Sequence, residues 1–214
     1  MIAFVIPATL IVVITNFFPP INSLNSDNIT TATKDTATPT SKVVKCFNVA
    51  CAESCTGGNV SAFLTSMSGS SNWYHLGQTT YHIDEKVDKL AVNRENAEMS
   101  NCVNEQVAYE MSKGLLDDGH AINVTTTGYV GTTDESHIPF YWVGICSRFE
   151  HNAIRIGVDV TKIDNKMIEQ LGLSSNVTQR VLCQKFMAWY AVKLMDWHFS
   201  KHKNEFLDTL SLCI

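Results

Sequence analysis

The sequence predicts an α/β (α+β) domain, a single three-layer sandwich in which helices flank a mixed sheet. Two observations carry this prediction. Short runs of β-branched and aromatic residues alternate along the chain with longer segments of helical periodicity. The apolar fraction is 45% of 214 residues, which is enough to build one hydrophobic core. The sequence contains no internal repeat, so a solenoid is excluded.

The globular part is expected to start with a buried strand, a tight turn and a helix. The run over residues 43–52 is short, apolar and rich in β-forming residues, as in a strand buried on both faces. Gly57 and Gly58 end the turn that follows it. Val60 and Leu64 then recur at helical spacing, so we expect a helix that begins at the two glycines.

The rest of the chain continues the same alternation of strands and helices. Val107, Met111 and Leu115 form one apolar stripe, which is typical of an amphipathic helix. The remaining elements, in chain order, are a strand over 77–81, a helix over 104–116, strands over 121–127, 140–146 and 153–160, a short helix over 163–171, and a long helix capped by Ser175 that ends near residue 199. In the long helix we expect the following residues to face the core: Val181, Met187 or Ala188, Val192, Met195 and Phe199.

Residues 1–42 differ from the rest and are assigned to a separate segment. Residues 1–18 are nearly all apolar, and residues 22–42 form a linker rich in Ser, Thr and Asn. The apolar run has three interpretations: an N-terminal anchor, a signal peptide, or a targeting or start-site artefact. The predicted domain therefore covers residues 43–214. We expect a cytoplasmic protein, with membrane anchoring through residues 1–18 as the alternative.

Charge and cysteine content exclude several classes of function. Sixteen basic and 21 acidic residues give a formal net charge of −5, which argues against a nucleic-acid partner. The seven cysteines are scattered and contain no C-x-x-C pair, so neither a disulfide framework nor a zinc site is expected. Reduced, partly buried thiols favour a reducing compartment.

The turn over residues 53–58 is a candidate binding or catalytic site. A helix N-terminus presents free N–H groups and a partial positive charge, and two glycines allow a ligand to approach the backbone closely. Ser54 could bind a phosphate there or act as a nucleophile. By spacing alone, a capping serine or threonine followed by turn glycines is the more ordinary interpretation.

Several motifs beyond this turn occur in a recognisable order. They are AESCTGG at 52–58, GSSNWY at 69–74, GQTTYHIDEK at 77–86, VNEQV at 103–107, EMSKG at 110–114 and TGYVG at 127–131. Together they resemble the C-terminal domain of the competence/damage-inducible CinA family, whose stand-alone members are nicotinamide-nucleotide amidases. The resemblance covers residues 43–146 and, more loosely, the helix that contains Arg180.

The resemblance implies hydrolysis of the carboxamide of nicotinamide mononucleotide to nicotinate mononucleotide and ammonia, without a metal or cofactor. It implies that Ser54 is the nucleophile and Lys86 its partner, and Tyr81 matches the tyrosine of the family motif. The residues expected to contact the nucleotide are Glu53, Thr56, Gly57, Gly58, Ser70, Ser71, Thr127 and Gly128. We also expect a homo-oligomer.

The chemistry of the residues agrees with this assignment. An amide is a poor electrophile, so a serine needs a base beside it. Lys86 can act as that base only when its amine is neutral, and a neutral amine requires burial without a counter-ion. Tyr81 could relay a proton or orient the lysine. The N–H groups of Thr56–Gly58 would hold either the oxyanion or the substrate phosphate.

Some positions leave alternatives open. Glu53 could fix the turn through hydrogen bonds instead of doing chemistry, and Cys55 is a possible second nucleophile. The segment 129–135 lacks the proline and two glycines of the family loop, and the bulky Tyr141 and Trp142 enter the next strand. These aromatics could narrow the site or stack on a ring. The alternatives to the amidase are an inactive nucleotide-binding or oligomerisation module and a hydrolase of another small amide.

Overall fold

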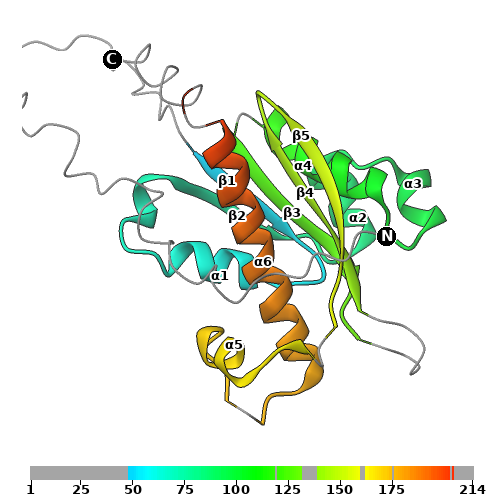
Figure 1. The fold of residues 1–214 in the computed structure, drawn as a ribbon. Helices are drawn as coiled ribbons and strands as arrows, with labels where there is room; N and C mark the ends of the chain where they lie inside the picture. Colours follow the sequence, from blue (N-terminus) through cyan, green and yellow to red (C-terminus); the bar gives the residue numbers. More distant parts are fainter. Residues whose placement is uncertain are drawn as a thin grey trace, which may run out of the picture. The chain divides into compact units, whose positions relative to one another are not determined.

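Five strands form one mixed sheet in the computed structural model, in the order β2-β1-β3-β4-β5 (Figure 1). Their bounds are β1 Val49–Glu53, β2 Tyr74–Thr79, β3 Ile122–Tyr129, β4 Phe140–Ser147 and β5 His151–Gly157. The structure describes residues 48–118, 120–131, 139–159, 162–174, 176–202 and 204. The predicted α/β class with a mixed sheet is confirmed.

The parallel part of the sheet gathers three strand ends at one edge. Strand β1 is parallel to both β2 and β3, and its last residue, Glu53, pairs with Thr79 and with Thr126. All five residues of β1 are buried, which explains why its sequence is a continuous apolar run that ends in one acidic residue. The residues that follow β1 and β2 therefore lie beside the end of β3.

The antiparallel part of the sheet leads away from that edge. Strands β3 and β4 are antiparallel, so Tyr129 pairs with Phe140 at the edge just described and Ile122 pairs with Ser147 at the opposite one. The turn between β4 and β5 therefore lies at the amino ends of the parallel strands. Five residues of extended chain separate Ile122 from Thr127, a distance of about 17 Å.

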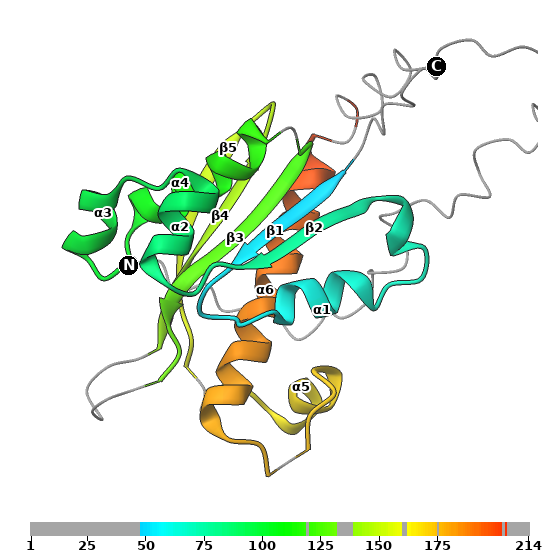
Figure 2. The same ribbon diagram turned by 180° about the vertical axis from the view of Figure 1, so that it is seen from behind.

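Helices cover both faces of the sheet, so the predicted three layers are present. The helices are α1 Asn59–Thr65, α2 Ile83–Leu90, α3 Arg94–Met99, α4 Glu105–Asp117, α5 Asn165–Gln170 and α6 Gln179–Lys201, with a 3-10 turn η3 at Ser70–Asn72. Helices α1 and α6 pack together on one face, and α2 and α4 pack together on the other (Figures 1 and 2).

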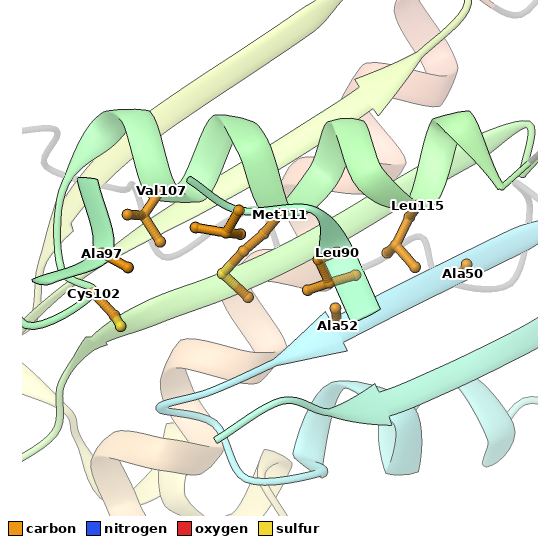
Figure 3. Close-up of a cluster of buried hydrophobic side chains, with 9 residues drawn as sticks. Ala50, Ala52, Leu90, Ala97, Cys102, Val107, Met111 and Leu115 are labelled. Atoms are coloured by element: carbon orange, nitrogen blue, oxygen red, sulfur yellow. The ribbon is translucent and has the colours of Figure 1, made fainter. Parts of the chain in front are cut away.

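The stripe predicted on α4 forms the centre of one apolar layer. Val107, Met111 and Leu115 are fully buried and point toward β1, where Ala50 and Ala52 make room for them (Figure 3). The other buried members of the cluster are Leu90, Val92, Ala97 and Cys102. This layer holds α2 and α4 against the sheet.

The final helix differs from the prediction at its start. Its N-cap is Thr178, whose Oγ1 accepts a hydrogen bond from the N–H of Val181 at 3.4 Å, so the cap predicted at Ser175 is wrong. Val181 is 38% exposed and does not face the core, because it lies in the first turn of the helix. The other predicted core positions are buried: Met187, Ala188, Val192, Met195 and Phe199.

Two helices and part of one strand were not predicted. Strand β2 begins at Tyr74, three residues before the predicted start. Helix α2 has the sequence IDEKVDKL, in which five charged side chains leave too few apolar residues for a clear helical period. Helix α3 has only six residues. Both helices pack against α4, and this tertiary contact stabilises them although their own sequences show no clear helical period.

The predicted apolar segment at 1–18 and the linker at 22–42 lie outside the described residues, so the three interpretations of the N-terminus stay predictions. Within the part of the chain that the structure describes, no helix combines the length and hydropathy needed to cross a bilayer. The five cysteines in that part are all buried free thiols: Cys51, Cys55, Cys102, Cys146 and Cys183.

The close approach of α4 to the sheet requires a glycine at position 144. A Cβ atom there would lie 2.3 Å from the carbonyl oxygen of Ala108 and 2.5 Å from Thr125 Oγ1. We expect Gly144→Ala to lower the free energy of unfolding by about 1–3 kcal/mol in urea denaturation, because backbone must move to admit the methyl group. The matched control is Gly157→Ala on β5, where a Cβ would meet nothing within 4 Å. Equal stability of the two variants would contradict the prediction.

Candidate functional site

The candidate site lies where β1, β2 and β3 end. Ser54 follows β1 directly, and its backbone N–H donates to the carbonyl oxygen of Thr126 at 2.9 Å. Thr80 and Tyr81 follow β2, the neighbouring strand. Carboxyl ends of parallel strands meet at one edge, which is where α/β domains bind ligands. The structure thus brings Ser54, Tyr81 and the start of the TGYVG segment together.

The turn after Ser54 is held by the buried carboxylate of Glu53. Its two oxygens accept hydrogen bonds from the backbone N–H groups of Gly58, Val60 and Ser61 at 2.8–3.0 Å. They also accept from the hydroxyls of Ser61 and Thr56, at 2.8 and 2.7 Å. The carboxylate therefore supplies the cap of α1, which no side chain of its N-cap residue Gly58 could provide.

This cap changes the expectation for the helix start. The N–H of Gly58 is taken by Glu53, and the N–H of Gly57 donates to the carbonyl oxygen of Ser54 at 3.2 Å. Neither group is free for a substrate oxygen. Among the described residues, the backbone N–H groups of Cys55 and Thr56 donate to no other residue. These two groups are adjacent to Ser54, and both residues are buried, with Cys55 3% and Thr56 0% exposed.

The two glycines are needed for the shape of the turn. Gly57 and Gly58 have φ angles of 61° and 93°, a region that other residues rarely adopt. With these φ angles the chain reverses direction between β1 and α1. The first N–H groups of α1 then point to the carboxylate of Glu53. The glycines therefore shape the site through their backbone.

Lys86 is buried at the same edge, only 1% exposed. Its Nζ donates to the carbonyl oxygens of Thr80 and Tyr81, at 2.7 and 2.9 Å. Burial lowers its pKa, and the neighbouring thiols of Cys102 and Cys55 oppose this only weakly. Among the described residues, no carboxylate pairs with it. The structure thus provides the counter-ion-free burial that a neutral lysine requires.

The side chain of Tyr81 points away from this lysine environment and toward α6. It is 58% exposed, and its hydroxyl accepts a hydrogen bond from Nη2 of Arg180 at 3.2 Å. The main-chain oxygen of Tyr81, not its phenol, orients Lys86. An exposed aromatic ring beside a guanidinium suits a ligand that has both a flat ring and an anionic group.

Arg180 and Gln184 also belong to this edge, which the sequence did not predict. Arg180 reaches Tyr81, and Nε2 of Gln184 donates to the carbonyl oxygen of Cys55 at 3.2 Å. The two residues lie one turn apart on α6, a spacing that places them on the same side of a helix. That spacing alone is common in helices, so it gave no signal of a site.

Other predicted contacts are engaged within the protein. The hydroxyl of Thr127 is buried and donates to the carbonyl oxygen of Cys102 at 2.6 Å. Gly128 allows Tyr141 to approach, since a Cβ there would lie 2.4 Å from Tyr141 Cβ. Tyr141 itself is fully buried, so it packs beneath the edge and does not line an open cleft.

Ser70 and Ser71 do not reach this edge. They form η3, which precedes β2 and lies next to the start of β1, where the N–H of Val49 donates to the carbonyl oxygen of Trp73. Strand β1 separates Val49 from Ser54 by about 17 Å. The prediction that these serines contact the substrate is therefore not supported within one chain, because parallel strands begin and end at opposite edges.

Cys55 is a poor nucleophile in this setting. Burial raises the pKa of its thiol to about 12, and the charge of Glu53 adds to that shift. The thiol is therefore protonated at neutral pH, whereas only a thiolate attacks carbonyl groups efficiently. Cys55 is buried, whereas its neighbour Ser54 is only half-buried.

Fold and site together define an α/β domain in which a strand–turn–helix carries Ser54 and a buried lysine without a carboxylate partner is held at the end of the neighbouring strand. The family model "CinA C-terminal domain" matches residues 38–175. The chain belongs to this family. The resemblance seen in the sequence motifs is thereby confirmed.

Two relatives illustrate the range of the similarity. A CinA-like protein of Chlorobaculum tepidum is 40% identical over 112 residues, which are 50% of this chain and 26% of the relative. The nicotinamide-nucleotide amidohydrolase PncC of Enterobacter agglomerans is 35% identical over 104 residues, which are 47% of this chain and 63% of that protein. The chain thus matches only about a quarter of the longer relative.

Solved structures resemble the fold. A competence damage-inducible protein A from Klebsiella pneumoniae superposes with a TM-score of 0.58 at 22% identity, covering 74% of this chain and 89% of that one. A CinA superfamily protein from another Klebsiella pneumoniae strain gives 0.58 at 21% identity, covering 74% and 91%. At this identity the comparison establishes the shared fold alone.

The role of Glu53 can be tested by stability. We expect Glu53→Gln to lower the free energy of unfolding by at least about 2 kcal/mol, because an amide replaces one charged acceptor with a donor that faces buried donors. Glu85→Gln, an exposed change on α2, is the control and should stay within about 0.5 kcal/mol of the native chain. Urea denaturation measures both. A neutral effect of Glu53→Gln would contradict the assigned capping role.

Proposed function

We propose that this domain is an amidohydrolase that converts nicotinamide mononucleotide to nicotinate mononucleotide and ammonia, with Ser54 as nucleophile and Lys86 as base. The observation that carries the proposal is the buried Lys86, whose pKa is lowered and whose Nζ is held by Thr80 at the end of β2, the strand next to the one that Ser54 follows. The name of the Enterobacter agglomerans relative supports the choice of substrate.

The first half of the proposed reaction forms an ester. Neutral Lys86 accepts the proton of Ser54 Oγ, and Oγ attacks the carboxamide carbon to give a tetrahedral oxyanion. The N–H groups of Cys55 and Thr56 are the proposed donors to that oxyanion. The C–N bond then breaks, and ammonia leaves with the proton that Lys86 holds, which leaves the nicotinoyl group on Ser54.

The second half restores the enzyme. Lys86, neutral again, accepts a proton from a water molecule, and the hydroxide attacks the ester carbon. Collapse of this second tetrahedral intermediate breaks the bond to Ser54 Oγ, which regains its proton from Lys86. The products are the carboxylate of nicotinate mononucleotide and the free enzyme, so one water is consumed for each ammonia released.

The proposed substrate contacts come from β2 and α6. Arg180 offers a guanidinium fork that suits a phosphate, and its neighbour Tyr81 offers an exposed ring that suits stacking on the pyridine. Glu53 and Gly58 then act on the substrate only through the turn they shape. The predicted homo-oligomer stays part of this proposal.

The proposal is tested by incubating the full-length chain with nicotinamide mononucleotide and measuring ammonia and nicotinate mononucleotide. We expect Ser54→Ala and Lys86→Arg to reduce turnover by about 10²–10⁴-fold. The arginine keeps the positive charge but does not deprotonate, so it separates base catalysis from charge. The matched controls are Ser70→Ala and Lys89→Arg, a serine at the opposite edge and an exposed lysine on α2.

Each outcome has a distinct meaning. Turnover that survives in Ser54→Ala would remove Ser54 as the nucleophile. Binding of the nucleotide without turnover by the native chain would overturn the amidase and favour the inactive nucleotide-binding module. Release of ammonia only from other small amides would overturn the assigned substrate but leave the reaction class intact.

The pH dependence of turnover provides a separate prediction. The base must be neutral, so kcat should rise with pH through the pKa of Lys86. Because burial lowers that pKa, the rise should be centred below the ordinary value of a lysine, about 10.4. Rates of the full-length chain at saturating substrate across the alkaline range measure this. A rise centred at or above the ordinary value would contradict the assignment of Lys86 as the base.

A further inference from the structure

We propose that Glu150, His198 and His202 form a binding site for Zn²⁺ at the edge of the sheet opposite to the candidate active site. One ligand atom from each residue lies within 4.8 Å of the others. Glu150 lies in the turn between β4 and β5, and the two histidines lie at the C-terminal end of α6. The site joins two elements that are far apart in the sequence.

The spacing of the histidines suits a shared ligand. His198 and His202 are four residues apart, so their side chains lie on the same side of α6, one turn apart. The ring of His202 stands with its Nε2 at 2.8 Å from Oε2 of Glu150, and Nδ1 of His198 is 3.9 Å from the same oxygen. Imidazole nitrogens with one carboxylate favour zinc over Mg²⁺ or Ca²⁺, which prefer oxygen ligands.

The distances fit the coordination that zinc prefers. Tetrahedral bonds of about 2.0–2.1 Å place neighbouring ligand atoms about 3.3 Å apart. The two separations from Glu150 Oε2, 2.8 and 3.9 Å, lie on either side of that value. Small rotations of the side chains would bring three ligands around one ion, and a water molecule would complete the tetrahedron.

The second observation is an unpartnered nitrogen aimed into the cluster. His198 is fully buried, yet its Nδ1 has no hydrogen-bond partner. An unsatisfied buried polar atom costs free energy, so such atoms usually mark a missing partner. Nδ1 is the atom that faces the carboxylate of Glu150. A cation between them would satisfy both groups.

The other nitrogen of the His198 ring is already held as in a metal site. Nε2 lies 2.9 Å from Oγ of Ser147. In the tautomer in which Nε2 donates to that hydroxyl, Nδ1 carries a free lone pair, and the hydroxyl can then donate to the carbonyl oxygen of Glu150, 3.5 Å away. Metal-binding histidines characteristically donate their second N–H in this manner, which fixes the tautomer and the ring.

Lys201 would compete with a metal ion for the carboxylate of Glu150. Its Nζ lies 2.8 and 2.7 Å from the two oxygens of Glu150. Its side chain is 46% exposed, so it can turn into solvent when an ion binds. Removal of this charge should therefore strengthen zinc binding, because Glu150 loses a rival partner and the site loses a repelling cation.

Zinc at this site would tie α6 to the β4–β5 turn. Helix α6 runs from Arg180, at the candidate active site, to His198 about 27 Å further along. A metal that binds the folded chain only stabilises it by mass action. The site is independent of the proposed amidase reaction and can be tested without any measurement of activity.

The test is a zinc titration of the full-length protein, stripped of metal with a chelator, in competition with a chromophoric zinc indicator. We expect one site whose affinity falls at least about tenfold in Glu150→Gln and in His202→Gln. Lys201→Gln should bind more tightly than the native chain, a gain that misfolding could not produce. His75→Gln, which removes a histidine on β2, should leave binding unchanged.

The chemistry of the ligands is tested with Co²⁺ in place of zinc. Nitrogen and oxygen ligands give only the weak visible bands of the metal, whereas a thiolate adds an intense charge-transfer band. The proposal is overturned if that thiolate band appears, if Glu150→Gln and His202→Gln bind zinc as tightly as the native chain, or if Lys201→Gln does not bind more tightly. Loss of binding in His75→Gln would likewise overturn it.

Discussion

The rest of the candidate site depends on the buried carboxylate of Glu53 and its five N–H and O–H donors around the start of α1. A buried charge is tolerated only when it is fully hydrogen-bonded, and here the free N–H groups of a helix start meet that need. The same bonds fix the path of the turn that presents Ser54. They also engage the N–H groups of Gly58, Val60 and Ser61, so these groups are not free to bind a ligand.

A second buried charge completes the edge from the other helical layer. Lys86 on α2 is held by the main-chain oxygens of Thr80 and Tyr81, which are neutral acceptors. Glu53 accepts hydrogen bonds from backbone and hydroxyl donors, whereas burial without a carboxylate partner lowers the pKa of Lys86. Glu53 thus organises the turn, and Lys86 is the residue proposed above to accept a proton.

Helix α6 connects this edge with the opposite one. Its first turns contribute Arg180 and Gln184 to the surroundings of Tyr81 and Cys55, and its last turn contributes the two histidines that face Glu150. A ligand at either end would therefore act on the same rigid element. The position of α6 over β3 and β4 makes it the element through which the two proposed sites could be linked.

The sequence by itself determined the alternation of strands and helices, the apolar stripe on α4 and, through its motifs, the resemblance to the family. These features are local, because a hydrophobic period or a sequence motif depends only on residues that are close together in the chain. Only the tertiary structure decided that Ser70 and Ser71 lie at the amino ends of β1 and β2, away from Ser54. A motif alone does not show at which end of a strand its residues lie. The tertiary structure also decided the contacts of Arg180 and Gln184, which lie 99 and 129 residues from their partners in the chain. Contacts of that separation arise from the packing of α6 on the sheet, which no local pattern in the chain specifies.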